Sequence, residues 1–562
     1  MKAIFKFRQC LSARVLPLFC KSSSTMSSVP ENDEVEGVVC KASELADNSM
    51  KEFPLGEDGG KVLVVKQHGE IFAVGSKCTH YGAPLANGAL GEGRVRCPWH
   101  GACFNIKSGD IEDFPGLDSL PCYKVEVTSD GDVKVKGKKS DLTVSKRAKQ
   151  LTCRDPVNSQ AIVIIGGGAA GASCVETIRQ EGFTGRVVLI SKEPHLPYDR
   201  PKLSKMLDVD VKKIYLRSED FYLNNGIEIL KGVEATNIDT KGKVVTLSNG
   251  ESVKYSSVFI ASGSRPRTMK VPGSDLNNIF TIRVPEDAKA IFSQLTPKSN
   301  VVVVGSSFIG MEAAAFCVGK VNSVVVLGRS SDPFKETLGE NVGSRIRHLF
   351  ENTKGVIMEM NVQVTEFGGK DGKVSSVKLN DGRTLDADVV IVGIGAIFNS
   401  EFLSQSEVET TGNGAVQTNE YLQTNVENVY AGGDIAHAPV FAIGNKKAAI
   451  GHWQIAHYHG HVAAKNMVGK KTSLRTVPFF WTMLFGMSVR YAGYGGGFDK
   501  VEVVHEDILK FVAYYLQKDE VVAIATLGKD PIAAKFAELL YEGKKLTTSD
   551  IKDNAWVTAA KA

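Results

Sequence analysis

Two short loops carry side chains that can bind metal. Cys78-Thr79-His80 and Cys97-Pro98-Trp99-His100 each supply one thiol and one imidazole, and 16 residues separate them. Three interpretations fit these residue types: a structural zinc site, a [2Fe–2S] cluster with two thiolates on one iron and two imidazoles on the other, or a fortuitous pattern. Zinc fingers usually place a Cys pair before a His pair. Because each loop here contributes one Cys and one His, the pattern favours the cluster.

Glycines indicate a nucleotide site further along the chain. Gly166-Gly167-Gly168-Ala169-Ala170-Gly171 follows the apolar run Ala161–Ile165 and precedes a helix-like stretch. In such a loop one glycine permits the turn, one lets the backbone approach a pyrophosphate, and one lets helix and strand pack. The next strand, Arg186–Ile190, leads to Glu193, which can bond a ribose diol. The pattern predicts a dinucleotide site with these contacts: Gly166, Gly168, Gly171 and Glu193.

A second copy of this pattern begins at residue 300. Val301–Val304 runs into Gly305-Ser306-Ser307-Phe308-Ile309-Gly310, and the next strand is Ser323–Leu327. Two such folds predict two dinucleotides, with Gly305 and Gly310 at the second. Ser307 replaces the middle glycine, so its side chain intrudes where the pyrophosphate would approach, and we expect weaker or shifted binding.

The residues after this second copy bear on the choice of nicotinamide cofactor. Gly328 stands where an acidic residue would select the unphosphorylated ribose. Arg329 and Ser330 follow it and offer a cation and a hydroxyl to a 2′-phosphate. They favour NADPH over NADH, with Arg329 as the contact; an arginine in solvent is the alternative.

Composition limits the kind of protein that positions these loops. The chain has 562 residues, of which 43% are apolar and 23% charged, and this length predicts roughly three to four domains. The net charge of +4 is too weak to suggest nucleic acid as a partner. No apolar run reaches the length of about 18 residues that a membrane span needs.

The coarse pattern of elements changes twice along the chain. Before residue 138, short strands with turns predict an all-β unit, as in Lys61–Lys66 and Ile71–Val74 around His68-Gly69. After residue 160, apolar strands alternate with helical stretches, which is the α/β pattern. From Val477 onward, β-like runs and the helical stretch Ile532–Tyr541 predict a third unit of mixed type.

The first thirty residues contain no acidic side chain. They contain five basic residues and five serines after residue 20, which is the composition of a mitochondrial presequence. We therefore expect a mitochondrial location, with the cytoplasm as the alternative.

The stretches CTHYGAPL and CPWHGACFN closely resemble the Rieske family. Respiratory members carry an extra Cys in each loop, and here Ala83 and Trp99 stand at those places, so the resemblance is to the ferredoxin-type branch. It implies a [2Fe–2S] cluster with four ligands: Cys78, His80, Cys97 and His100.

Roughly residues 161–560 resemble the two-dinucleotide-binding flavoproteins, with FAD in the outer fold and NAD(P)H in the inserted one. Pro197–Lys205 (PYDRPKLSK) narrows the resemblance to oxygenase-coupled ferredoxin reductases and proteins similar to apoptosis-inducing factor, and Tyr430–Asp434, His452–Ala456 and Val477–Trp481 fit the same pattern. It implies that Arg200, Lys205, Asp434 and Trp453 contact FAD, and that Lys205, Glu312 and Trp481 shape the catalytic site. Core packing remains the alternative for Trp481.

The expected fold is multidomain. An all-β Rieske domain is followed by an α/β reductase with tandem Rossmann-like FAD and NAD(P)H units and by an α+β C-terminal domain. The expected boundaries are 1–35 for a disordered or targeting segment, 36–137 for the Rieske domain, 138–160 for a linker, 161–290 and 416–475 for the FAD unit, 291–415 for the NAD(P)H unit, and 476–562 for a C-terminal interface domain. A swinging Rieske domain and a fixed docking are equally consistent with the linker.

Together the resemblances are to the Rieske-containing branch of the apoptosis-inducing factor family. They imply an FAD-dependent oxidoreductase that passes electrons from NADH or NADPH through FAD to the cluster and to an unidentified external acceptor, with a link to apoptosis and a homodimer both open. No Cys lies between Cys174 and Cys317 or beyond Cys317, so a dithiol relay beside the flavin is excluded. The alternative is a redox-sensing cell-death or scaffold protein in which nucleotide binding controls conformation and turnover is incidental.

Four other histidines form a group in the sequence. His437, His457, His459 and His461 lie close in the sequence, but no carboxylate completes an iron-binding facial triad among them. We interpret them as histidines on a helix surface.

Overall fold

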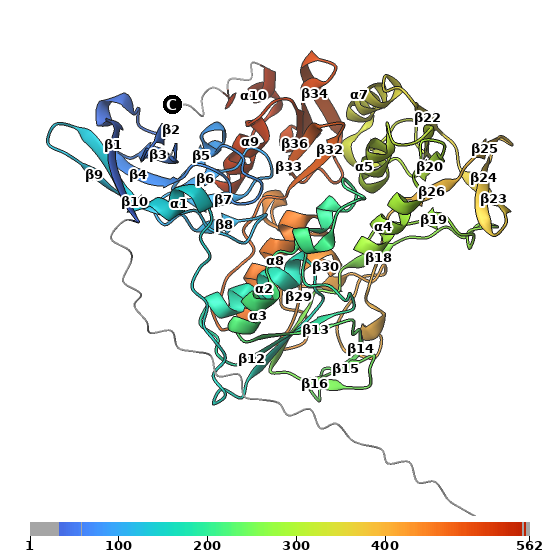
Figure 1. Ribbon diagram of the computed structural model, residues 1–562, viewed down its shortest axis with the longest axis horizontal. Helices are drawn as coiled ribbons and strands as arrows, with labels where there is room; N and C mark the ends of the chain where they lie inside the picture. Colours follow the sequence, from blue (N-terminus) through green and yellow to red (C-terminus); the bar gives the residue numbers. More distant parts are fainter. Residues whose placement is uncertain (1–32, 58, 553–555, 558–562) are drawn as a thin grey trace, which may run out of the picture.

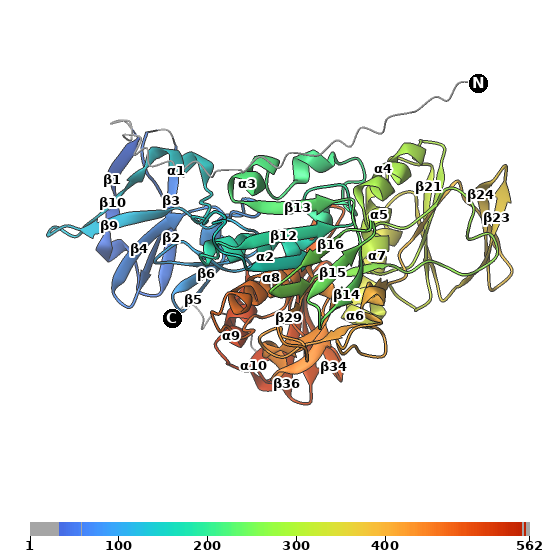
Figure 2. The same cartoon turned by 90° about the horizontal axis from the view of Figure 1, so that it is seen from below.

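The computed structural model describes residues 33–57, 59–552 and 556–557. The expected segment 1–35 therefore lies almost entirely outside the described residues. Figure 1 and Figure 2 show an N-terminal β domain at one end of an elongated molecule and the second nucleotide-binding unit at the other, with the first nucleotide-binding unit and the C-terminal unit between them. Among the described helices, none is both long enough and apolar enough to span a membrane.

The N-terminal β domain consists of two antiparallel sheets, and the predicted hairpin around His68-Gly69 is confirmed. The larger sheet has the order β1 (Glu34–Lys41), β10 (Asp132–Lys138), β9 (Cys122–Val127), β4 (Glu70–Gly75), β3 (Lys61–Gln67), β2 (Ser49–Pro54). The smaller sheet has the order β5 (Ala89–Gly91), β6 (Arg94–Arg96), β7 (Cys103–Asn105), β8 (Ile111–Asp113). The Cys78 loop follows β4, and the Cys97 loop joins β6 to β7.

The first nucleotide-binding unit is built on a five-stranded parallel sheet. Its order is β13 (Ile227–Lys231), β12 (Arg186–Ser191), β11 (Ala161–Ile165), β17 (Ser257–Ile260), β29 (Val429–Ala431). These strands are apolar runs because helices and a small sheet cover both faces. The covering elements are α2 (Ala169–Gln180), α3 (Glu219–Asn224), α8 (Trp453–Met467), β14 (Ala235–Asp239), β15 (Val244–Leu247), β16 (Ser252–Lys254), and the group β28 (Val416–Gln417), β30 (Ala436–Val440), β31 (Lys446–Ala449).

The second unit repeats this design. Its parallel sheet has the order β19 (Ile279–Phe280), β26 (Val389–Val392), β20 (Asn300–Val304), β21 (Ser323–Gly328), β22 (Val356–Met360). Around it lie α4 (Pro285–Gln294), α5 (Phe308–Cys317), α6 (Lys335–Leu338), α7 (Glu340–Glu351), β23 (Val364–Lys370), β24 (Lys373–Leu379) and β25 (Thr384–Asp386).

The chain passes from the first nucleotide-binding unit to the second, and back again, at positions other than the expected 291 and 416. The two-residue strand β19 and helix α4 already belong to the second unit, and Leu403 is back in the core of the first. The pair β18 (Ser264–Pro266) and β27 (Ala396–Phe398) joins the two connecting segments. Such short strands carry too little apolar periodicity to be located from sequence.

The C-terminal unit is a five-stranded antiparallel sheet covered by a helix. Its order is β32 (Phe479–Leu484), β33 (Met487–Gly493), β36 (Glu520–Leu527), β35 (Lys510–Gln517), β34 (Lys500–Asp507). The predicted helical stretch is confirmed as α9 (Ile532–Tyr541), and α10 (Thr548–Lys552) follows it. Helix α9 lies against β5 and β6 of the N-terminal β domain.

The segment expected to be a plain linker, 138–160, is ordered and attached at both ends. It contains α1 (Lys139–Val144). Arg147 pairs with Ser119 of the β domain, and the Thr152 amide donates to the Arg179 carbonyl of the first nucleotide-binding unit at 3.1 Å. The segment thus joins the two domains as a linker, and backbone pairing with both of them orders it although it has no apolar periodicity.

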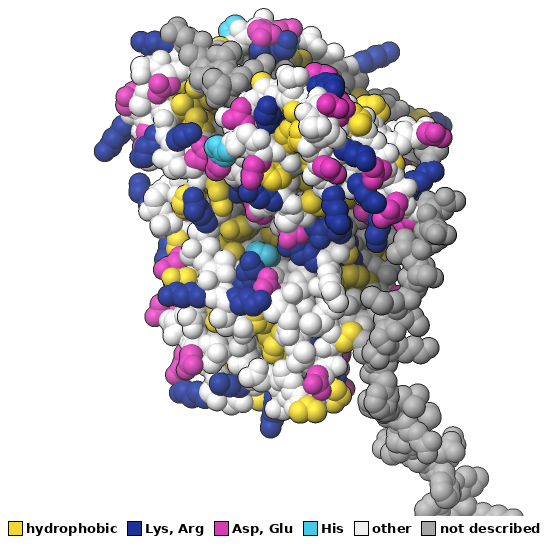
Figure 3. Space-filling model, turned by 90° about the vertical axis from the view of Figure 1, so that its left-hand side faces the viewer, with side chains coloured by type: hydrophobic (Ala, Val, Ile, Leu, Met, Phe, Trp, Pro, Cys, Tyr) yellow, Lys and Arg dark blue, Asp and Glu magenta, His cyan; other side chains and the backbone are white. Residues whose placement is uncertain are grey.

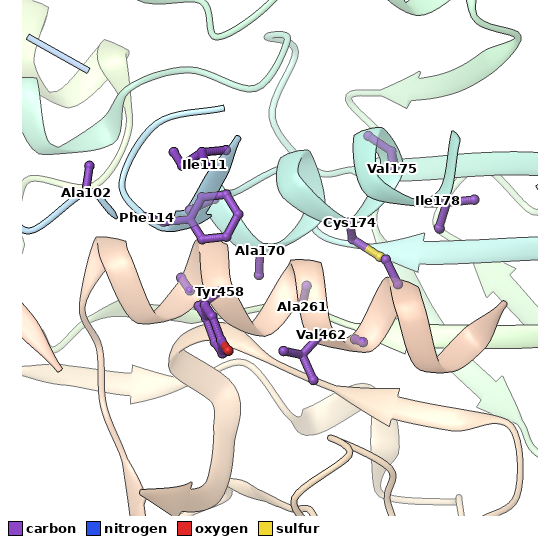
Figure 4. Packing of buried hydrophobic residues seen from close by; sticks show 14 of the residues in the cluster. Ala102, Ile111, Phe114, Ala170, Cys174, Val175, Ile178, Ala261, Tyr458 and Val462 are labelled. Carbon is purple, nitrogen blue, oxygen red and sulfur yellow. The ribbon is translucent and has the colours of Figure 1, made fainter. Parts of the chain in front are cut away.

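The β domain also packs on the centre of the reductase. Figure 4 shows Ile111 and Phe114 beside α2 and α8, close to Ala170 and Tyr458. These residues belong to one buried apolar cluster that also includes Cys174 and Val462. In this structure, therefore, the Rieske domain is docked on the reductase.

Candidate functional site

The two metal-binding loops bring their side chains together in like pairs. Nδ1 of His80 lies 3.1 Å from Nδ1 of His100, and the thiols of Cys78 and Cys97 are hydrogen-bonded to each other. Each loop is closed by a glycine with positive φ, Gly82 or Gly101, whose amide donates to the carbonyl of the loop's cysteine.

Backbone amides inside these turns point at the sulfurs. The amides of His80 and Tyr81 donate to Cys78 Sγ, and those of Trp99 and His100 donate to Cys97 Sγ. Hydrogen bonds of this kind stabilise thiolates and tune a cluster held by them.

The donor set fits a [2Fe–2S] cluster better than zinc. The side chains pair by type, imidazole with imidazole and thiol with thiol, which suits two irons that would each be held by one pair. Burial lowers the pKa of His100 to about 3 and also lowers that of His80. Both rings are therefore neutral, which is the form that binds metal.

A large cavity of about 1090 Å³ lies at the carboxyl ends of β11 and β12. Its wall includes Gly166, Gly168, Glu193, Arg200, Lys205, Glu312, Asp434, Trp453 and Trp481, so sequence-predicted residues far apart in the chain lie on one surface. Gly166 has φ +122°, and a Cβ there would lie 2.1 Å from the Ala261 carbonyl oxygen. A Cβ on Gly171 would lie 1.9 Å from the Gly166 oxygen, so Gly171 packs beneath the loop. The loop thus presents bare backbone toward the cavity, as a pyrophosphate site requires.

Charged groups are arranged along this cavity. Glu193 accepts hydrogen bonds from the Tyr198 hydroxyl and from Arg200, each at 2.6 Å. Burial opposes ionisation of Glu193, but Arg200 and Tyr198 outweigh it and hold the pKa of this carboxyl below its ordinary value. Asp434 accepts from the Ser264 hydroxyl at 3.0 Å. A carboxylate at each of these two places suits the hydroxyl groups of a dinucleotide.

Lys205 and Glu312 form a buried ion pair on the cavity wall. Lys205 Nζ lies 2.9 Å from Glu312 Oε2, and that carboxylate also accepts hydrogen bonds from Ser204 and from Thr482, the latter at 2.7 Å. Glu312 lies on α5 of the second unit, whereas Lys205 belongs to the first. The pair therefore marks the place where the two nucleotide-binding units meet.

Trp481 separates the cavity from the metal-binding loops. It lines the cavity, and its ring centroid lies 4.2 Å from that of His100 and 5.7 Å from that of His80. Trp453 lines the same cavity on α8. A single aromatic side chain thus bridges the two sites in the docked structure.

The second glycine loop lies at the far edge of this region. Phe308 and Ile309 line the cavity, but Gly305, Gly310 and Arg329 do not. A Cβ on Gly305 would lie 2.3 Å from the Gly393 oxygen, and one on Gly310 would lie 2.1 Å from the Gly305 oxygen. The turn therefore has the close backbone packing of a dinucleotide loop despite Ser307.

Arg329 is exposed directly after β21, while the Ser330 hydroxyl donates to Glu336 at 3.0 Å. If Arg329 binds a 2′-phosphate, Arg329→Ala will raise the KM for NADPH about tenfold, since a hydrogen bond to a charged group contributes about 1.5–3 kcal/mol, and will leave that for NADH unchanged. Flavin reduction rates with both nucleotides measure this, with Lys354→Ala, at an exposed position of the same unit, as control. A strong preference of the wild type for NADH would contradict the assignment.

Sequence reasoning missed the buried contacts that dock the β domain. Arg96 is completely buried and donates through Nε to Glu538 of α9, while Arg94 Nε lies 3.1 Å from the other oxygen of Glu538. Asp113 accepts from Gln454 at 2.7 Å and from Thr476 at 2.9 Å, and its Oδ2 lies 3.3 Å from Arg96 Nη1. An arginine in every second position of β6 was the only sequence signal.

The interpretation of four histidines on a helix surface was wrong for three of them. His437 lies on strand β30 and not on a helix. His457 and His459 are 1% and 5% exposed on α8. His459 Nδ1 accepts the Gly433 amide at 3.2 Å, and His457 packs between Trp453 and Phe114. His457 is buried because the β domain covers its face of α8 through Phe114, whereas His459 is buried against the first nucleotide-binding unit itself.

Comparisons with known proteins agree with this fold and site. A profile of the family described as pyridine nucleotide-disulphide oxidoreductase matches residues 160–460, and a Rieske [2Fe-2S] domain profile matches residues 36–124. The chain belongs to the pyridine nucleotide-disulphide oxidoreductase family and carries a Rieske domain before the reductase. It is 44% identical to human apoptosis-inducing factor 3 over 542 residues, which cover 94% of this chain and 89% of that protein.

Bacterial reductases match the second part of the chain. The benzene 1,2-dioxygenase system ferredoxin–NAD(+) reductase subunit of Pseudomonas putida is 32% identical over 334 residues, 59% of this chain and 80% of that protein. The solved covalent putidaredoxin reductase–putidaredoxin complex matches with a TM-score of 0.68 and 27% identity, covering 72% of this chain and 100% of that chain. The protein is thus a ferredoxin-reductase-like NAD(P)H oxidoreductase with FAD, a [2Fe–2S] cluster and NAD(P)H as its cofactors.

Proposed function

We propose that this chain delivers electrons from NAD(P)H to an external acceptor through a cluster held by its own docked Rieske domain. FAD supplies hydride acceptance and single-electron release, and the [2Fe–2S] cluster supplies one-electron transfer. The observation that carries the proposal is the position of Trp481, which lies in the cavity wall and within 4.2 Å of His100, measured between ring centroids.

The chain's own side chains have separate roles in this proposal. Gly166 and Gly168 cradle the FAD pyrophosphate, while Glu193, Arg200 and Asp434 hold the rest of the dinucleotide. Lys205 and Glu312 orient the reacting rings, because their ion pair is buried and fixed by Thr482. Trp453 and Trp481 exclude water from the flavin. Cys78, His80, Cys97 and His100 hold the cluster.

The proposal is tested by adding NADPH or NADH anaerobically to the purified, iron-replete protein. We expect the flavin absorption to bleach and an EPR signal of a reduced Rieske-type cluster to develop, followed by rapid reduction of cytochrome c or a quinone. Very slow oxidation with a long-lived complex of reduced flavin and nicotinamide would instead favour the redox-sensing alternative. A flavin-only spectrum would contradict the proposal.

We also propose a mitochondrial location, supported by the basic, acid-free composition of the first thirty residues, with the cytoplasm as the alternative. A part in cell death is supported only by the name of the relatives at 44% and 43% identity. Fluorescence microscopy of the full chain and of a chain that begins at Met26 distinguishes the two locations. A mitochondrial signal that does not depend on the first 25 residues would contradict a presequence.

A further inference from the structure

We propose that the face around Tyr81 is where the external acceptor docks, and that this acceptor is a one-electron carrier protein with an acidic face. The inference rests on the proposed function, since it concerns where electrons leave the Rieske domain. For this purpose the Tyr81 face is defined by Lys77, Tyr81, Pro84, Lys146, Lys202 and Met206.

The two histidine ligands face different surroundings. His100 is 9% exposed and lies against Trp481 on the side of the flavin cavity. His80 stacks on Tyr81 with ring centroids 3.8 Å apart and an interplanar angle of 17°. Tyr81 is 37% exposed. Each ring also touches the other's neighbour, since His80 lies 5.7 Å from Trp481 and His100 lies 5.2 Å from Tyr81, between ring centroids. The shorter contact of His100 is with Trp481, toward the flavin cavity, and the shorter contact of His80 is with Tyr81, which reaches the surface.

The Tyr81 ring is held in this position by the reductase. Its hydroxyl donates to Asp199, and Lys202 Nζ lies 5.0 Å from the ring centroid. Both partners belong to the Pro197–Lys205 loop, whose Arg200 and Lys205 line the FAD cavity. These contacts fix the ring when the Rieske domain is docked. The docked state therefore contains both the path by which electrons reach the cluster, past Trp481, and the path by which they leave it, past Tyr81.

The charge around Tyr81 is positive. Lys77, at the base of the Cys78 loop, is exposed, as is Lys146; Lys146 and Lys202 both act electrostatically on His80. Two carboxylates near Tyr81 are paired with cations: Asp199 is 6% exposed and pairs with Lys202, and Asp118 pairs with Arg217 at 2.8 Å. Asp208 and Asp210, which follow Met206, are exposed at the edge of this face. Figure 3 shows the end of the molecule that carries the Rieske domain, where Lys and Arg side chains are spread among acidic ones.

Exposed apolar groups accompany these lysines. Tyr81 and Pro84 are exposed on the Cys78 loop, and Met206, 45% exposed, follows the Pro197–Lys205 loop. An apolar centre with a basic rim fits an acidic protein, because complementary potentials speed the encounter and orient the partner. A small hydrophobic acceptor such as a quinone would gain nothing from the lysines.

The electron balance is simple. Oxidation of one NAD(P)H releases two electrons and one proton, and each encounter at the Tyr81 face transfers one electron. Two acceptor molecules are therefore reduced per nucleotide, each from the ferric to the ferrous state when the acceptor is a cytochrome.

The test uses the full-length holoprotein with two probes, the acidic haem domain of cytochrome b5 and the basic cytochrome c. Binding of oxidised cytochrome b5, measured by surface plasmon resonance without nucleotide, and its reduction rate with NADPH should both weaken with salt. The double substitution Lys77→Glu and Lys146→Glu should weaken both about tenfold at low ionic strength. For the basic cytochrome c, the same double substitution should strengthen binding and speed reduction. Lys124→Glu, a single charge reversal on β9 of the same domain, is the control, and the double substitution should have more than twice its effect because it reverses two charges.

Equal effects of the double substitution and Lys124→Glu on cytochrome b5 would overturn the inference, as would wild-type binding and reduction rates that do not change with salt. The EPR signal of each NADPH-treated variant separates this failure from failure of the proposed function. If NADPH does not reduce the wild-type cluster, the proposed function fails. If NADPH reduces the cluster but the lysine substitutions do not change the binding and reduction of cytochrome b5, only the proposed docking site fails. If the double variant loses its cluster, the salt dependence of cytochrome b5 binding and reduction by the wild type tests the docking site instead.

Discussion

Replacing Glu538 with alanine will release the Rieske domain from the reductase. The substitution removes the carboxylate that Arg96 and Arg94 share, and Arg96 is completely buried. Breaking a buried pair by deleting one partner costs about 3–5 kcal/mol, and here the buried Arg96 would keep only its contact with Asp113 as a counter-charge. We expect this loss in the free energy of docking, seen as separate thermal transitions for the cluster's visible circular dichroism and for flavin fluorescence.

A matched control lies at the end of the same helix. Glu542 pairs with Lys544, whose side chain is 69% exposed, and a surface pair of this kind contributes less than about 1 kcal/mol. Glu542→Ala should therefore keep a single transition. If Glu538→Ala shifts the transition no more than Glu542→Ala does, the buried ionic contacts do not hold the domains together.

The same contact gives docking a defined pH dependence. Burial would raise the pKa of Glu538, but Arg96 and Arg94 offset it and bring the pKa below its ordinary value. A lowered pKa in the docked state means that this stabilisation is fully present above the ordinary carboxyl pKa of about 4.3 and is lost as the pH falls through the lowered value. We expect docking to be stable near neutrality and to weaken in acid, with the weakening reduced in Glu538→Gln.

His100→Ala will leave a flavoprotein that cannot pass electrons to a protein acceptor. His100 is one of two imidazoles whose Nδ1 atoms face each other at 3.1 Å, so the substitution removes one of the two side chains that would hold one iron. Loss of outer-shell partners alone costs about 10–100-fold in metal affinity or activity. We therefore expect the Rieske EPR signal to disappear and cytochrome c reduction to fall about 100-fold or more, while ferricyanide is still reduced from the flavin.

His68→Ala is the control for this prediction. His68 lies on the same domain, is 65% exposed through its side chain and pairs with Glu92 at 2.8 Å. Its removal should change neither the EPR signal nor the reduction rates. Cytochrome c reduction by His100→Ala at the wild-type rate would show that electrons reach the acceptor without the cluster.

The sequence sufficed for the sites whose geometry is local. The Cys78 and Cys97 loops and the glycine turns at Gly166 and Gly305 are fixed by a few consecutive backbone angles, so residue types at short spacing predict them. The two nucleotide folds and the helix Ile532–Tyr541 were predicted for the same reason, since each has a clear hydrophobic period.

Contacts between units could not be predicted. Arg96 and Glu538 are 442 positions apart, and no local pattern relates a strand arginine to a helix glutamate. His457 resembled a surface residue because its covering element, the Rieske domain around Phe114, comes from the other end of the chain. The order of the linker could not be predicted for a related reason, since it comes from partners such as Ser119 and Arg179.

The linker, which is attached to both neighbouring domains, also determines which iron–sulfur domain can accept electrons from the flavin. A reductase and ferredoxin that are separate molecules meet at a rate set by their concentrations, whereas two docked parts of one chain keep a constant effective concentration. Cluster reduction in this protein should therefore be unaffected by dilution. The docked Rieske domain also occupies the side of the cavity where Trp481 lies, so a free ferredoxin would compete poorly for the flavin. In a cell that contains many ferredoxins, this flavin would therefore still reduce only the iron–sulfur centre of its own chain.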